Sequence, residues 1–466
     1  MNRALSDQNL LDLTEEKARA LYAQGEEAVI FALLQLNALA RQKQAGAGVD
    51  PATPSSQIPV YKKPTGKKRK AKRGQKKGHK GACRKPPLKI DRFVEHRLEC
   101  CPDCGGAVGP ARATRTRVIE DIQQAEVETT EHTIHAHYCP RCKKRVEAKV
   151  LDALPKSTLG TRALALSAWL HYGLGQTISQ VAALFDSLFH FEVSAGGLSQ
   201  QWARLAVILL AWYEQIAEQA RASAVLHADE TGWRVEGQTH WLWCFVTPTL
   251  SYYVIDRTRG SPVVNGFLGD CYQGTLITDF YSAYNKVTAN KRQVCMVHLL
   301  RELAKVTERN ESDEWISYWR TLRRVLKDAL RLARRADREA PDYASKRARI
   351  HQRLDCIVAA DHADPDCKRL NKRLTKHRED LFTFLDDPRV APDNNRAERE
   401  MRPAVIARKN SYQNASPNGA RTQAVLMTVY RTLKLRGHDP LQTIADALAA
   451  YIATGKLPPL PGAPTA

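Results

Sequence analysis

The sequence predicts a multidomain α+β protein, and three observations support this prediction. The chain has 466 residues, a length that suggests two to four domains at roughly 100–200 residues per domain. Hydrophobic residues make up 43% and charged residues 26%, which excludes wholesale disorder, a collagen-like chain and a small disulfide scaffold. Helix-like segments, a Cys-rich segment and strand-like segments follow one another along the chain.

No stretch of about 18 apolar residues occurs, so no transmembrane helix is expected. Acidic residues interrupt the N-terminus where a signal peptide needs an apolar core; they are Asp7, Asp12, Glu15 and Glu16. We therefore expect a cytoplasmic protein with no membrane partner.

Residues 1–50 contain a predicted helix over 8–45, rich in Ala, Leu, Glu and Gln. Four apolar residues have the a/d spacing of a coiled coil, for about two heptads only: Val29, Leu33, Leu36 and Ala40. A short dimerisation helix and an ordinary packed helix both stay open.

The formal net charge of +21 is concentrated in two blocks. Residues 51–90 hold 14 Lys and Arg and no Asp or Glu, while 396–436 hold nine Lys and Arg and two Glu. Such blocks are typical of polyanion binding, and nucleic acid is the commonest polyanion; a solubilising basic tail is the alternative. The block at 51–90 lacks an apolar face, which predicts a flexible arm. Its candidate DNA-binding residues are Lys67, Lys68, Arg69, Lys70, Lys72, Arg73, Lys76 and Lys77.

Two Cys-x-x-Cys pairs predict a zinc-ribbon-like domain over 91–155. The pairs are Cys101 with Cys104 and Cys139 with Cys142. Two residues between thiolates let both sulfurs reach one tetrahedral ion, and four thiolates in a closed geometry are typical of structural Zn²⁺. The long separation between the pairs predicts a strand excursion, at the alternating segment 125–137. Cys100 as a competing ligand and a redox-active pair are the alternatives.

Residues 156–220 have helical periodicity. We expect helices over 164–170, 178–185 and 198–213, with a turn at 193–197. This order suits a helix-turn-helix, and a generic three-helix packing unit is the alternative.

Residues 221–440 form the predicted α/β domain. Strand-like runs occur at 224–228, 241–246, 252–255, 275–278 and 294–297. They predict three consecutive strands followed by strand–helix alternation. A charged helical insertion over 299–390 precedes further helices, and residues 441–466 complete the last helix and a Pro-rich tail.

Three acidic residues stand out by their context. We expect Asp229 and Asp279 to end strands at one edge of the sheet and Glu398 to lie on a helix capped by residues 393–395. Converging carboxylates repel one another unless cations bind. Two Mg²⁺ ions would relieve the repulsion and activate a nucleophile at a phosphate. From the residues alone, an Asp at a strand end is more often an ordinary cap or turn residue.

These acidic residues lie in segments that resemble the insertion-sequence 66 family of bacterial transposases. The segments are Asp229-Glu230-Thr231-Gly232-Trp233, Thr278-Asp279-Phe280-Tyr281-Ser282-Ala283-Tyr284, Asn394-Asn395-Arg396-Ala397-Glu398-Arg399 and Arg402-Pro403. The Gly74-Gln75 and Gly78-His79 pairs, Gly81, the two Cys pairs and the stretch around Arg408-Lys409-Asn410-Ser411, Ser416 and Gly419 also match in order. The resemblance covers about residues 60–440.

The resemblance implies a DDE transposase with a ribonuclease-H-like catalytic domain. The family's Asp, Asp and Glu carry over onto Asp229, Asp279 and Glu398, which implies two bound Mg²⁺ ions. Five basic residues around the Glu would hold the DNA backbone, with a solvated helix face as the alternative: Arg396, Arg399, Arg402, Arg408 and Lys409. Cys295 and His298 resemble a Cys-x-x-His pair of several transposase families, although Met296 replaces a frequent Trp; a buried structural pair is the favoured interpretation.

The implied function is Mg²⁺-dependent DNA cleavage and strand transfer at the ends of an insertion sequence. The alternatives are an inactive DNA-binding regulator and a structure-specific nuclease on the same fold. Expected partners are the terminal inverted repeats, target DNA, a second copy of the chain on DNA and small accessory proteins encoded by the same element. The expected location is the bacterial cytoplasm, in association with the nucleoid.

Overall fold

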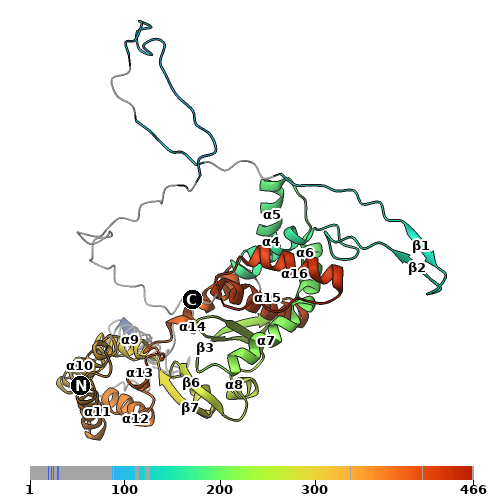
Figure 1. Ribbon diagram of the computed structural model, residues 1–466. Helices are drawn as coiled ribbons and strands as arrows, with labels where there is room; N and C mark the ends of the chain where they lie inside the picture. Colours follow the sequence, from blue (N-terminus) through green and yellow to red (C-terminus); the bar gives the residue numbers. More distant parts are fainter. Residues whose placement is uncertain are drawn as a thin grey trace. The chain divides into compact units, whose positions relative to one another are not determined.

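The computed structural model describes residues 89–110, 115–120, 126–335, 337–411 and 413–463, with a few isolated positions before residue 88 (Figure 1). The chain divides into two compact units: Lys63–Glu126, and Met1–Lys62 with Val127–Ala466. Almost all of the predicted N-terminal helix over 8–45, and all basic residues proposed between 67 and 77, lie outside the described residues. None of the described helices combines the length and hydropathy needed to cross a bilayer.

A short antiparallel hairpin follows the smaller unit. It consists of β1 (Ala136–Cys139) and β2 (Lys144–Glu147), with Cys139 opposite Lys144. The strand predicted over 125–137 is therefore wrong for the described residues 126–135, which form no strand. Alternation predicts a strand only where a surface can bury the apolar side chains, and here Val127 and Ile134 are exposed.

Within residues 156–221, four α-helices precede the main sheet, consistent with the predicted helical periodicity. They are α4 (Thr161–Ala168), continued by the π-helix η2 (Trp169–Gly173), α5 (Ile178–Phe189), α6 (Ala195–Ile208) and α7 (Leu210–Arg221). The helix predicted over 198–213 is divided at Leu209, whose ψ of 2° ends α6. This division lets the buried faces of α6 and α7 both pack on α15 (Pro417–Leu435). The region thus shares one hydrophobic core with the sheet.

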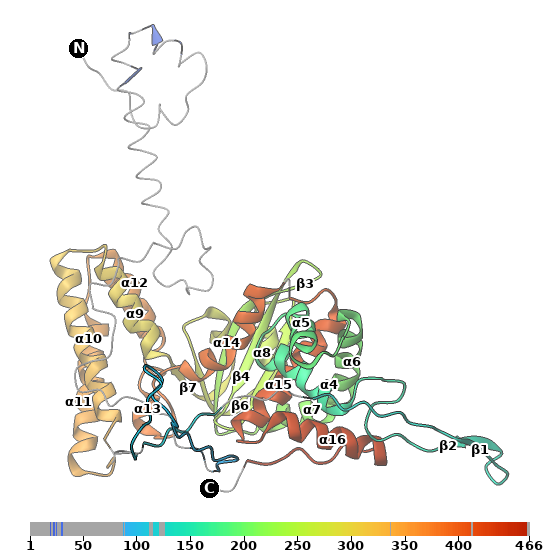
Figure 2. The ribbon, with the colours of Figure 1, turned by 90° about the horizontal axis from the view of Figure 1, so that it is seen from above.

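A five-stranded mixed sheet forms the centre of the larger unit (Figure 2). Its strands are β3 (Val225–Val235), β4 (Gln238–Val246), β5 (Ser251–Asp256), β6 (Tyr272–Thr278) and β7 (Ala289–Val294). Their order is β5-β4-β3-β6-β7; the pairs among the first three are antiparallel, and β3–β6 and β6–β7 are parallel. A two-residue turn with positive φ at Glu236 and Gly237 joins β3 to β4, as the right-handed strand twist favours. The predicted three strands followed by alternation are confirmed.

Helices connect the strands and pack on the sheet. In the chain, α8 (Ser261–Leu268) lies between β5 and β6, and the 3₁₀-helix η3 (Ser282–Lys286) lies between β6 and β7. After the helical insertion in the chain, α14 (Asn395–Asn410) packs on β3 and β4, while α16 (Pro440–Thr454) packs on α4. The edge strand β5 donates its Ser251 and Tyr253 N–H groups to Thr432 and Thr428 of α15, at 3.1 and 3.0 Å. These bonds occupy backbone groups that an open sheet edge would otherwise expose.

A helical insertion lies beside β7, as Figures 1 and 2 show. Its helices are α9 (Met296–Thr307), α10 (Asp313–Ala333), α11 (Pro341–Ala359), α12 (Pro365–Lys376) and α13 (Thr383–Asp386), around a separate hydrophobic core. The predicted helical insertion is confirmed, but the strand predicted over 294–297 is wrong, because β7 ends at Val294 and α9 begins at Met296. The apolar run is buried in both elements, so periodicity alone could not divide it.

Gln293 joins this insertion to the sheet. Its fully buried side chain donates to the carbonyl oxygens of Val294 (2.7 Å) and Leu381 (3.0 Å) and accepts from the Phe384 N–H (3.0 Å). We predict that Gln293→Ala lowers the free energy of unfolding by about 2–3 kcal/mol, because it leaves buried backbone groups without partners. Thermal unfolding should show a Tm lower by about 4–10 °C.

Gln273→Ala is the matched control, because Gln273 is an exposed glutamine on β6. A Tm for Gln293→Ala equal to that of the control would contradict the role assigned to Gln293.

Candidate active site and metal centres

The two aspartates lie at the same end of neighbouring strands. Parallel pairing joins Val225 to Thr275, Leu226 to Leu276 and His227 to Ile277. Asp229, within β3, and Asp279, directly after β6, each follow the last of these pairs by two residues. The prediction that Asp229 ends its strand is wrong: β3 continues to Val235 with β4 as its partner, and β6 is the strand that ends, at Thr278.

A backbone N–H group holds one oxygen of each aspartate. The Glu230 N–H donates to Oδ1 of Asp229 (2.9 Å), and the Tyr281 N–H donates to Oδ1 of Asp279 (2.8 Å). Burial raises the pKa of Asp229 well above its usual range, and the charges of Glu230 and Asp279 raise it further. Burial likewise raises the pKa of Asp279, although the Tyr281 N–H lowers it in part. The two groups therefore form a carboxylate pair whose ionised form needs a neighbouring cation.

Asn394 brings the third carboxylate to this pair. Its buried side chain donates from Nδ2 to the Ala228 carbonyl oxygen (2.8 Å) and lies 3.1 Å through Oδ1 from Nδ1 of His227. The residue is at the N-cap of α14, but its side chain makes no capping bond. Thus Asn394 fixes the first turn of α14 against β3 directly before Asp229, and Glu398 lies in that turn.

Glu398 faces two side chains from α9. Its Oε1 lies 3.8 Å from Nε2 of His298 and 3.6 Å from Nη1 of Arg301. This oxygen is buried and makes no hydrogen bond in the structure. Burial lowers the pKa of His298, and the Glu398 charge opposes that shift. Glu398 also raises the pKa of both Asp229 and Asp279, so all three carboxylates interact electrostatically.

Cys295 and His298 have separate surroundings. Cys295 is fully buried, its Sγ accepts the Asn394 N–H (3.3 Å), and burial raises the pKa of its thiol to about 11. His298, three residues later, is directed to Glu398. The structural interpretation therefore suits Cys295, whereas His298 contacts a candidate active-site residue.

Glu230 is a fourth acidic residue beside the pair. Its side chain is 2% exposed and forms an ion pair with Arg259 at 2.7 Å. The Tyr284 hydroxyl donates to its other oxygen, also at 2.7 Å. Burial raises the pKa of Glu230 to about 7, although Arg259 and Tyr284 favour its charged form.

Arg259 links Glu230 to the segment that holds Asp279. Its guanidinium lies 3.9 Å from the ring centroid of Tyr281 and 4.4 Å from that of Trp241. The Tyr281 hydroxyl in turn donates to the Arg259 carbonyl oxygen (3.2 Å), and the Tyr281 N–H is the group bonded to Asp279. Sequence reasoning missed Arg301, Arg259 and the role of Glu230. Glu230 could be identified from its position beside Asp229, whereas no local sequence motif marks Arg259 or Arg301.

The donor set fits divalent cations. Three carboxylates interact, and a buried Glu398 oxygen lacks a hydrogen bond, so the oxygen ligands that Mg²⁺ prefers are present. Their ligand atoms do not approach one another as closely as those of Glu314, His362 and Cys367, which lie within 4.8 Å of one another and form the single such group among the described residues.

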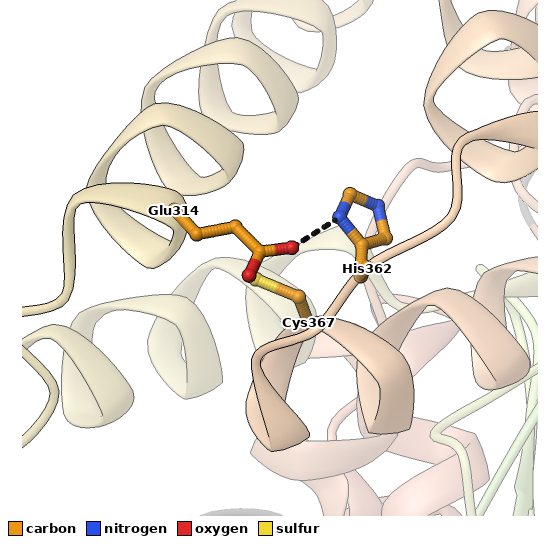
Figure 3. Close-up of side chains that lie close together, drawn as sticks. All are labelled: Glu314, His362 and Cys367. Carbon is orange, nitrogen blue, oxygen red and sulfur yellow. Dashed lines mark hydrogen bonds and ion pairs between the residues drawn. The ribbon is translucent and has the colours of Figure 1, made fainter.

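That second group lies in the insertion and is already bonded (Figure 3). Both Glu314 oxygens accept N–H groups: Oε1 from Ala363 (2.9 Å), with Nδ1 of His362 at 3.1 Å, and Oε2 from Asp364 (2.8 Å). Burial raises the pKa of the Cys367 thiol to about 12. These contacts let Glu314 fix the loop before α12, while Nε2 of His362 is buried without a hydrogen-bond partner.

The four predicted zinc ligands lie in two tight turns, one in each unit. In the first, the Gly105 N–H donates to the Cys101 carbonyl oxygen (2.9 Å), and Gly105 adopts a φ of 71°, which favours glycine. N–H groups of Asp103 and Cys104 lower the pKa of Cys101. In the second turn the Cys142 N–H donates to Sγ of Cys139 (3.4 Å) and lowers the pKa of that thiol. Thiolates stabilised in this way are suitable metal ligands.

The basic residues around Glu398 divide into two groups. Arg399, Arg402 and Lys409 are exposed on α14, and Arg396 is half-buried. Arg408 instead donates to the Thr231 hydroxyl (2.7 Å) and the Gly232 carbonyl oxygen (3.1 Å). Arg408 therefore joins α14 to β3.

The Glu230–Arg259 pair generates a stability prediction. Arg259→Met should lower the free energy of unfolding by about 3–5 kcal/mol, because it leaves a buried carboxylate without its cation. Glu230→Gln in addition should restore much of this loss. A double-mutant cycle measured by chemical denaturation tests the pair; additive effects of the two substitutions would mean that they do not interact.

Two family models match this chain. A family model described as "Transposase IS66 family" matches residues 156–422, and one described as "zinc-finger binding domain of transposase IS66" matches residues 99–143, a range with all four predicted zinc ligands.

Three similar proteins come from Sinorhizobium fredii (strain NBRC 101917 / NGR234). "Uncharacterized protein y4qI" is 28% identical over 77% of this chain and 72% of its own length. "Uncharacterized protein y4hP" is 23% identical over 78% and 72%, and "Uncharacterized protein y4jD" is 23% identical over 78% and 77%. The family match spans more than half of the chain and confirms the family predicted from the motifs. The chain belongs to the IS66 family of transposases and carries the zinc-finger domain of that family.

Proposed function

We propose that this chain is a Mg²⁺-dependent transposase that cleaves DNA at the ends of an insertion sequence and transfers the freed strand. The supporting observation is the placement of three carboxylates: Asp229 and Asp279 at the same end of neighbouring strands, and Glu398 held beside them by Asn394. The sheet order, with three antiparallel strands and then two parallel ones, agrees with the ribonuclease-H-like domain that the family resemblance implies.

Asp229, Asp279 and Glu398 would hold two Mg²⁺ ions. When bound, these ions supply an activated oxygen nucleophile and stabilise the leaving oxygen at a phosphate. The protein's part is mainly positioning and charge. The Glu230 and Tyr281 N–H groups orient the aspartates, and Arg301 and His298 limit the positions of the Glu398 carboxylate. Exposed Arg399, Arg402 and Lys409 would hold the DNA backbone beside it.

The segment α5–α6 supports a helix-turn-helix role in end recognition. Thr177 and Ser194 cap the two helices, and residues 190–194 connect the helices. The first turns of α6 expose Ser199 and Gln200, polar side chains of the kind that read base edges. The basic arm over 51–90 would add affinity that is salt-dependent and independent of sequence.

Transposition joins two DNA ends, so we propose that the chain acts as at least a dimer on DNA. Accessory proteins of the same element are further proposed partners, and the cytoplasmic nucleoid is the proposed location. The retained Asp, Asp and Glu argue against an inactive regulator. End recognition by α5–α6 and the zinc finger argues against a nuclease that only cleaves.

Asp279→Asn tests the catalytic assignment. Paired duplexes carrying the inverted repeats that flank the gene are incubated with protein and Mg²⁺. The variant should bind these ends with unchanged affinity and lose strand transfer to the level seen without Mg²⁺, because the amide is a poor ligand for a divalent ion.

Asp270→Asn is the control, since Asp270 is an exposed acid just before β6. Strand transfer by Asp279→Asn at the wild-type rate would contradict the catalytic role proposed for Asp279. Cleavage without transfer by the wild type would indicate the nuclease, and binding alone the regulator.

We further propose that Cys101, Cys104, Cys139 and Cys142 bind one structural Zn²⁺. Purified wild-type protein should contain about one zinc per chain by elemental analysis, and Cys142→Ser should contain much less, because three remaining ligands leave the tetrahedral site open. Cys271→Ser, at an exposed cysteine outside the finger, should retain the zinc. Equal zinc contents in both variants would exclude this ligand set.

A further inference from the structure

Helix α10 is the most strongly amphipathic element of the insertion. Ser312 caps it by accepting the Trp315 N–H. One face is buried in the insertion core and includes Trp315, Leu322, Val325 and Leu326. Because this face is covered, the opposite face is the part of α10 that is available to a partner.

The opposite face carries four exposed cations, here called the α10 basic stripe: Arg320, Arg323, Arg324 and Lys327. They occur within two turns, over about 10 Å at 1.5 Å per residue. The one carboxylate beside them, Asp328, is already bound by Arg353 (2.7 Å) and Arg331 (3.2 Å). Among the residues that the structure describes, no acid forms an ion pair with any of the four.

Other acids of the insertion are engaged elsewhere. Asp342 binds Arg335 and Lys346, Asp386 binds Arg347, Asp355 binds Arg378, and Glu302 binds Arg369 and Arg373. Pairing within the insertion thus leaves the charge of the α10 basic stripe uncompensated. Repulsion among clustered cations destabilises the folded chain, and a bound polyanion relieves this repulsion.

The α10 basic stripe lines a surface hollow of about 310 Å³, together with Trp319, Asp328 and Arg331. The Arg323 guanidinium lies 5.5 Å from the Trp319 ring centroid, so the indole limits its positions. Arginines suit phosphate because their planar donors form paired hydrogen bonds with its oxygens.

We propose that the α10 basic stripe binds the phosphate backbone of duplex DNA, independently of its sequence. This inference rests on the proposed function, which brings DNA to the neighbouring carboxylates. Duplex DNA carries about six phosphates over 10 Å of its axis. A membrane surface is not suitable, because an interfacial helix must expose its apolar face and that of α10 is buried.

Helix α9 connects the stripe's surroundings to the candidate active site. Its His298 and Arg301 face Glu398, and one residue later Glu302 binds Arg369 and Arg373 of α12. Helix α10 packs on α9, α11 and α12. Helix α9 therefore contacts both α10 and Glu398. DNA held on α10 would be bound to a part of the protein that α9 joins to the candidate active site.

The experiment measures duplex affinity as a function of salt. The full chain and its R320Q/R323Q/R324Q/K327Q variant are titrated, without Mg²⁺, against a fluorescent duplex of arbitrary sequence from 50 to 300 mM salt. Each lost phosphate contact reduces the slope of log K against log[salt] by about 0.9. We expect the variant's slope to be shallower by about 2–4 and its thermal unfolding to be unchanged.

The matched control is R349Q/K368Q/K372Q/K376Q, which removes four exposed cations from α11 and α12 of the same insertion. Its slope should change by less than about 1. A stripe variant with the wild-type slope, or a control with an equal loss, would overturn the proposal. The proposed function is tested by a different measurement, which is strand transfer by the wild type and its loss in Asp279→Asn. Failure of the stripe proposal can therefore be distinguished from failure of the proposed function.

Discussion

The side chain of Asn394 is the contact on which the candidate active site depends. One hundred residues separate the end of β7 at Val294 from the start of α14 at Asn395, and the chain leaves the sheet and returns to it at one point. There the Asn394 N–H donates to Cys295, and the Met296 N–H donates to Pro392, at 2.9 Å. Because the Asn394 amide also binds the carbonyl oxygen that precedes Asp229, the returning helix has a fixed position on β3. The insertion can therefore be large without displacing Glu398.

The electrostatics of the site follow from this placement. Burial and mutual repulsion raise the pKa of both aspartates, and the nearest cations are divided among different acids. Arg259 is bound to Glu230, and Arg301 reaches only Glu398. The aspartates therefore lack a side-chain cation bonded directly to them among the described residues. A divalent ion would supply the missing charge, which is the physical reason for regarding the three carboxylates as a metal site.

Much of the fold could be predicted from the sequence, because alternation and helical periodicity report which faces are buried. Four of the five strands and the helical insertion are predicted in this way; the strand predicted over 294–297 is wrong. The errors arose where local pattern and tertiary context differ. Asp229 looks like the end of a strand because the strand-like run stops at residue 228, yet β4 pairs with β3 as far as Val235. The segment before Ala136 alternates, yet no described surface covers it.

The candidate site was less accessible to sequence reasoning. Composition could not select three carboxylates from 50 acidic residues; the family motifs did. Arg408 matched a motif and was expected to bind DNA, but its guanidinium binds β3. Arg259 lies 29 residues from Glu230 without a motif between them, so only the folded chain relates the two.

Anomalous diffraction at the manganese edge, from crystals of the full chain soaked in Mn²⁺, shows directly whether the three carboxylates bind a divalent ion. We expect manganese bound between Asp229, Asp279 and Glu398, in contact with the Glu398 oxygen that lacks a hydrogen bond. Manganese at other sites only, with these carboxylates unliganded, would contradict this expectation.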